Sequence, residues 1–80
     1  MKLGTPVEVT WADATSVTAW ATLDEHQAVE PRVVKSAGYL SRADKSSVQI
    51  VQSVQQDPDG LVGDSLTIPR GWVKRIRRLR

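Results

Sequence analysis

The side chains that could act as nucleophile, base or metal ligand are few. The chain has one histidine, His26, and no cysteine. His26 lies beside Asp24 and Glu25, and an imidazole next to two carboxylates can bind a metal or exchange a proton. The polar stretch runs into Pro31, however, which favours an exposed loop histidine. A serine nucleophile needs a base, and the sequence offers His26 alone for that role. We therefore expect no catalytic residue and a protein that is not an enzyme.

Residues 57–64 combine aspartates and glycines in the manner of a calcium-binding loop. If Gly60 takes the sixth position of an EF-hand loop, Gln55 is first and Leu66 twelfth. Acidic ligands belong at both positions, so the pattern fails, and Pro58 with Gly60 predicts a solvated turn instead. No glycine-rich loop is followed by Lys and Ser or Thr, and without cysteine there is no thiolate zinc site. We expect no metal and no cofactor.

Charge is distributed unevenly along the 80 residues. Residues 1–69 hold five Lys or Arg and nine Asp or Glu, a net charge of −4, whereas residues 70–80 hold six cations and no acid. The six cations are Arg70, Lys74, Arg75, Arg77, Arg78 and Arg80. Such a cluster, with Trp72 among it, is typical of a surface that contacts phosphates with a steep salt dependence. The alternative is a solvated terminal strand whose cations balance the acidic body.

Short alternating segments predict a mostly β chain. In Pro6–Trp11 the side chains of Val7, Val9 and Trp11 share one face, which is the pattern of a half-buried strand. We predict further strands at residues 16–23, 32–40, 47–55 and 65–68, a hairpin turn at 41–46, and a loop or single helical turn at 24–30. Gly38 inside a strand predicts a bulge, a bend or a close backbone contact.

The C-terminal segment is ambiguous between helix and strand. Trp72, Ile76 and Leu79 have helical spacing, but the segment is short for an isolated helix, so we predict a 3₁₀ turn at residues 69–72 and a final strand. Ile68–Ile76 resembles the end of SH3 domains, in which a proline, two small or polar residues, an aromatic residue and a valine form such a turn. The resemblance implies an all-β, SH3-like small barrel of about five strands. The tyrosines and acidic loop that bind Pro-rich peptides have no counterpart here, so that activity is not implied.

Three motifs carry a second resemblance, to short phage and prophage proteins without an assigned activity. They are Val9–Ala14, Gly38–Leu40 and Ile68–Val73, whose order and spacing match across most of the chain. This resemblance implies a bacteriophage origin and a shared fold, and it implies no chemistry.

These patterns indicate a binding protein rather than an enzyme. We expect one domain over residues 1–80, in the cytoplasm of a host cell, because no apolar run approaches the roughly 18 residues of a membrane span and the N-terminus lacks a signal peptide. We expect contact with a host or phage protein through Trp20 and Trp72, with self-association into a homo-oligomer left open. The alternative is a nucleic-acid-binding barrel that uses the six C-terminal cations.

Overall fold

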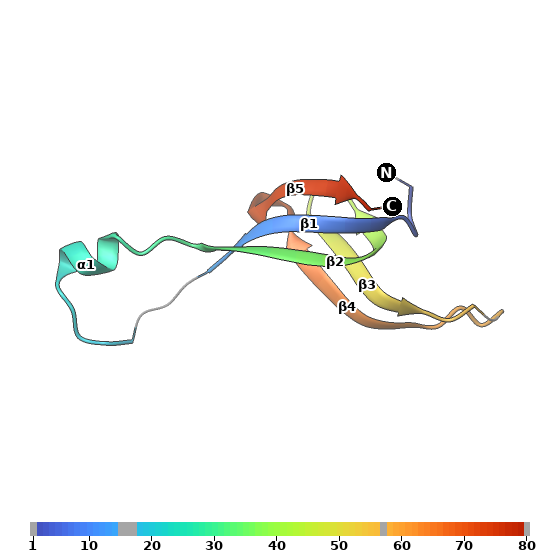
Figure 1. Ribbon diagram of the computed structural model, residues 1–80, viewed down its shortest axis with the longest axis horizontal. Helices are drawn as coiled ribbons and strands as arrows, with labels where there is room; N and C mark the ends of the chain where they lie inside the picture. Colours follow the sequence, from blue (N-terminus) through green and yellow to red (C-terminus); the bar gives the residue numbers. More distant parts are fainter. Residues whose placement is uncertain (1, 15–17, 57, 80) are drawn as a thin grey trace.

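The computed structural model describes residues 2–14, 18–56 and 58–79. Its strands are β1 (Pro6–Asp13), β2 (Arg32–Ala43), β3 (Ser47–Val54), β4 (Val62–Pro69) and β5 (Val73–Arg78). A short helix, α1 (Leu23–Gln27), lies between β1 and β2, and a 3₁₀ helix, η1 (Arg70–Trp72), precedes β5 (Figure 1). The prediction of a mainly β chain with about five strands and a 3₁₀ turn before the last strand is confirmed.

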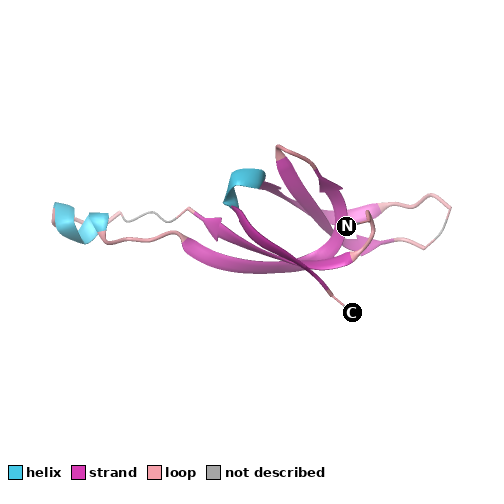
Figure 2. Ribbon diagram, turned by 90° about the horizontal axis from the view of Figure 1, so that it is seen from above, coloured by secondary structure: helices cyan, strands magenta, loops and turns pink. Residues whose placement is uncertain are grey.

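The strands form one antiparallel sheet in the order β4-β3-β2-β1-β5, so β4 and β5 are its free edges. The buried core consists of Val7, Val9, Leu40, Val48, Ile50 and Ile68. Trp11, Val73 and Ile76 pack against this core. Because β4 and β5 lie at opposite ends of the strand order and still contact the same core, the sheet must curve around it as an open barrel (Figure 2).

The bend in β2 is centred on Gly38. The strand pairs with β1 over Arg32–Tyr39 and with β3 over Tyr39–Ala43, so it passes from one side of the barrel to the other. A Cβ at Gly38 would lie 2.7 Å from the carbonyl oxygen of Val51 and 3.2 Å from Ile50 Cβ. The close backbone contact predicted at this glycine is therefore confirmed.

One strand prediction is wrong. Of residues 16–23, the described part at 18–22 forms no strand, and α1 begins at Leu23. The reason is a capping box, in which Thr22 Oγ1 accepts a hydrogen bond from the Glu25 amide at 3.2 Å and a Glu25 carboxylate oxygen accepts one from the Thr22 amide at 3.4 Å. Of the loop or single helical turn expected at residues 24–30, the helical turn is present as α1, which begins one residue earlier. Residues 15–17 lie outside the described residues, as does Asp57 of the expected turn.

The boundaries of the first hairpin turn are also shifted. Instead of turning at residue 41, β2 continues to Ala43, and the turn is held by Asp44. One oxygen of the Asp44 carboxylate accepts the amides of Ser46 and Ser47 at 2.8 and 2.9 Å, and the other accepts Arg42 Nε at 2.7 Å. β4 is longer than the predicted 65–68, because Val62 and Gly63 pair with the end of β3.

Candidate functional site

Residues 18–31 form a projection that we call the arm. It extends from the ends of β1 and β2 along the longest axis of a molecule that measures 57 × 23 × 21 Å (Figure 1). Its helix buries no residue, Trp20 is fully exposed, and Leu23 is 71% exposed. The arm is also acidic, since Asp24, Glu25 and Glu30 stand in a stretch without Lys or Arg. Trp20 thus lies where a partner can reach it.

Trp72 occupies a different environment from Trp20. Its ring stacks on Trp11 with centroids 6.4 Å apart, and 42% of its surface is exposed. Trp11 is held in turn by its indole N–H, which donates to Ser36 Oγ at 3.1 Å. A shallow pocket of about 270 Å³ lies beside Trp72 at the base of the arm, lined by Ala12, Asp13, Ala14, Pro31 and Trp72. Trp72 therefore combines a packing role with an accessible edge.

The pairing register sorts the C-terminal cations by face. Directly opposed residues of antiparallel strands point to the same side of the sheet. Thr10 follows the buried Val9 on β1 and therefore faces away from the core, and it is opposed by Arg75 on β5 and by Lys35 on β2. Arg77 is opposed by Glu8 on the same outer face, at an Nη2–Oε1 distance of 3.4 Å. We call Lys35, Arg75 and Arg77 the basic face.

The remaining C-terminal cations do not share this face. Arg78 is opposed by the buried Val7, so its side chain lies on the side of the sheet that faces the core. It lies past the residues that pack in the core. Arg70 lies in η1, and Lys74 lies at the irregularity where the pairing of β5 with β1 shifts. Arg80 is outside the described residues. The structure brings two of the six predicted cations together with a third, Lys35, that sequence reasoning missed.

Apolar side chains flank the basic face. On β2 the outward positions alternate as Val33, Lys35, Ala37 and Tyr39, all exposed. Val33 is 58% and Tyr39 41% exposed, so the outer surface of the sheet combines cations with uncovered apolar area. Such a mixture is more typical of a contact surface than of a purely solvated one.

His26 is the only side chain that the sequence offers as a catalytic base. His26 is exposed in the last turn of α1. Over the described ranges 2–14, 18–56 and 58–79, no three His, Cys, Asp or Glu side chains gather as a metal-binding group. In the same part of the chain, no helix is long and apolar enough to cross a membrane.

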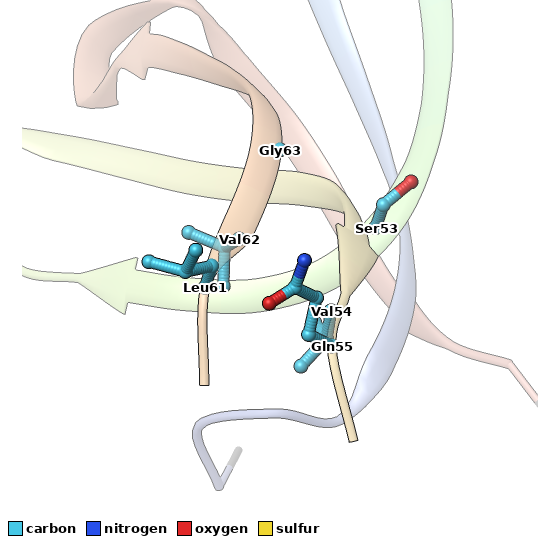
Figure 3. Close-up of a pocket in the computed structure, with 6 residues that line it drawn as sticks. All are labelled: Ser53, Val54, Gln55, Leu61, Val62 and Gly63. Carbon is cyan, nitrogen blue, oxygen red and sulfur yellow. The ribbon is translucent and has the colours of Figure 1, made fainter. Parts of the chain in front are cut away.

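A second open pocket, of about 370 Å³, lies between the facing ends of β3 and β4 (Figure 3). Its lining residues are Ser53, Val54, Gln55, Leu61, Val62 and Gly63. None of these six described residues carries an ionisable side chain. The pocket therefore offers apolar surface and amide or hydroxyl groups, and no acid or base.

Fold and surface together define a small, mainly β domain with an open five-stranded sheet, an acidic arm and a basic outer face. No protein-family model matches the chain, and neither a curated protein nor a solved structure matches it.

Proposed function

We propose that this chain is a non-enzymatic, phage-encoded binding module whose arm contacts a host or phage protein. The observation that carries the proposal is the full exposure of Trp20 on an arm whose helix buries no residue. Large aromatic side chains are the commonest anchors of protein interfaces, and leaving one in water is unfavourable. A partner that covers Trp20 removes that cost.

The experiment is affinity capture with the full chain tagged at its C-terminus. A photoreactive amino acid at Leu23 would cross-link proteins that lie on the arm, in lysates of host cells with and without phage. We expect a cross-linked protein with the wild-type arm and its loss in Trp20→Ala. The control is the same probe at Lys45, which is exposed in the turn between β2 and β3. A product that persists in Trp20→Ala would contradict the proposal.

Nucleic-acid binding is the second candidate, and the basic face supports it. Lys35 and Arg75 flank Thr10 on the outer face, and two or three aligned cations can follow a phosphate backbone. On this hypothesis random-sequence DNA or RNA binds at low salt and is released as salt rises. Because Arg78 leaves the strand on the other side, Arg75→Ala with Arg77→Ala should weaken binding more than Arg78→Ala. The absence of binding at low salt would exclude this candidate.

A further inference from the structure

The arm and the basic face have complementary properties. The arm presents three carboxylates and the apolar side chains of Trp20, Leu23 and Val29. The outer face of β2, β1 and β5 presents the cations Lys35, Arg75 and Arg77 among exposed apolar residues, against one anion, Glu8. Opposite charge on two surfaces that both carry apolar area is the usual condition for a specific contact.

Within one molecule the two surfaces do not meet. The arm continues away from the ends of β1 and β2 at one end of the long axis (Figure 1), whereas Lys35, Arg75 and Arg77 lie in the paired parts of β2 and β5, on either side of β1. No ion pair joins the arm to Lys35, Arg75 or Arg77 among the pairs found in the described residues. Two complementary surfaces that do not contact each other within one molecule can still do so between two molecules.

The amount of exposed surface points to the same conclusion. The radius of gyration is 16.2 Å, whereas a compact chain of this length has about 11.6 Å. The accessible surface is 6302 Å², whereas a compact monomer of this mass exposes about 4800 Å². The excess of about 1500 Å² is close to the roughly 1600 Å² that a standard protein interface buries in total. In an assembly in which each copy contributes its arm to one neighbour and its sheet to another, two standard contacts of about 800 Å² per partner would cover an area of this size.

We infer that the partner of the arm is a second copy of this chain, with the acidic arm of one copy docked on the basic face of the next. The inference rests on the proposed function, because it names the partner of the same arm. In this contact Trp20 lies against the exposed apolar and guanidinium groups of the neighbouring sheet, where Arg75 and Arg77 stack on its ring or pair with Asp24 and Glu30.

The contact joins two different surfaces, so it is heterologous. Each copy keeps one free arm and one free face after the first contact forms, and assembly continues until a ring closes or a filament grows. Association should therefore increase with protein concentration without stopping at a dimer, and it should weaken with added salt because exposed charges carry part of it.

Two charge-reversed variants test this geometry. The arm variant is Asp24→Lys with Glu30→Lys, which keeps the capping box of Thr22 and Glu25. The face variant is Arg75→Glu with Arg77→Glu. Sedimentation velocity over a concentration series should show wild-type oligomers and at least about tenfold weaker association of each variant alone, because like charges then oppose each other. Trp20→Ala should weaken association roughly 30-fold, the loss expected for an interface anchor.

The decisive sample is an equal mixture of the two variants. The basic arm of the arm variant then fits the acidic face of the face variant, and the acidic arm of the face variant fits the basic face of the arm variant. Mixed oligomers should therefore form although neither variant assembles alone. The single charge reversals Asp59→Lys and Lys45→Glu serve as controls; they lie at exposed positions in the turns after β3 and β2, outside both surfaces, and should assemble like the wild type. Rescue in the mixture also rules out misfolding as the cause of the losses.

Other outcomes would overturn the inference. Wild-type protein that stays monomeric at every concentration contradicts it, and so does association that survives both variants, which would place the contact at another surface such as the free edges β4 and β5. If the chain is monomeric and binds nucleic acid through Arg75 and Arg77, the basic face is a nucleic-acid-binding surface and the inference fails. If the chain is monomeric and Trp20 still captures another protein, the inference fails and the proposed function stands. If Trp20 captures nothing, both fail.

Discussion

The indole rings of Trp11 and Trp72 stack almost parallel, with 9° between their planes. This pair joins β1 to η1 at the end of the barrel from which the arm departs. The η1 segment is also tied to the turn before β3, because the Arg70 amide donates to the Ser46 carbonyl oxygen at 2.9 Å. The stack thus fixes the start of β5, and with it the strand that carries Arg75 and Arg77.

Trp72→Ala should lower the free energy of unfolding by about 1–3 kcal/mol, since it removes an aromatic contact from a half-exposed site rather than a fully buried one. In a domain of this size each kcal/mol shifts the thermal midpoint by roughly 4–8 °C, so calorimetry can measure the change. Trp72→Phe keeps a stacking ring and should lose less. An unchanged midpoint in Trp72→Ala would show that the stack does not hold η1.

Gly38→Ala should destabilise the fold by about 1–3 kcal/mol, because the new Cβ would lie 2.7 Å from the Val51 carbonyl oxygen. The neighbouring atom is backbone, which cannot move aside as a flexible side chain would. Gly71→Ala is the matched control, since nothing lies within 4 Å of a Cβ at that position. Denaturant unfolding of the two variants compares them directly, and equal midpoints would contradict the close approach at Gly38.

The sequence predicts those features of the fold that depend on the residues of a single segment. The alternation of Val7, Val9 and Trp11 is enough to predict β1 and its buried face, because a strand with one face in the core must follow that period. Gly38 predicts a bend for the same local reason. These features depend on residues within one segment, and local patterns can be read without knowledge of the partner strand.

The strand predicted at residues 16–23 is wrong because two local patterns compete there. Val17, Ala19, Ala21 and Leu23 alternate like a strand, but Thr22 and Glu25 also have the spacing of a capping box. An alternating segment forms a strand only where a neighbour supplies hydrogen bonds, and the described part of the arm has no such neighbour in the sheet. The capping box was the signal that could have found α1.

The basic face depends on pairing between distant segments. Lys35 and Arg75 are 40 positions apart and meet only because β1 opposes both β2 and β5. Nothing local in the sequence specifies that register, so the six C-terminal cations looked like one cluster. The strand geometry instead places Arg75 and Arg77 on the outer side of the sheet and Arg78 on the other side, and it adds Lys35 from β2 to the outer side.

Asp44 should titrate far below an ordinary aspartate. The hydrogen bond from Arg42, followed by those from the Ser47 and Ser46 amides, lowers the pKa of this carboxyl to about 2. A depressed pKa stabilises the folded state above the ordinary value of 3.8, and this contribution is lost as the pH falls through about 2. A carboxyl NMR titration measures the value directly. Arg42→Ala should raise the pKa towards the ordinary value, and an unchanged pKa would contradict the role of Arg42.

Trp20→Ala should leave the stability of the isolated chain within about 0.5 kcal/mol of wild type, because a fully exposed side chain contributes no packing. Trp72→Ala should lower the stability and Trp20→Ala should not. The two variants therefore distinguish the roles of the two tryptophans that the sequence predicts as contact residues. Thermal unfolding at low protein concentration, where no partner is bound, makes the comparison. A large loss in Trp20→Ala would show that the ring packs on its own sheet in solution, and the arm would then not be free to bind. An unchanged midpoint, combined with loss of cross-linking or assembly, would assign Trp20 to binding alone.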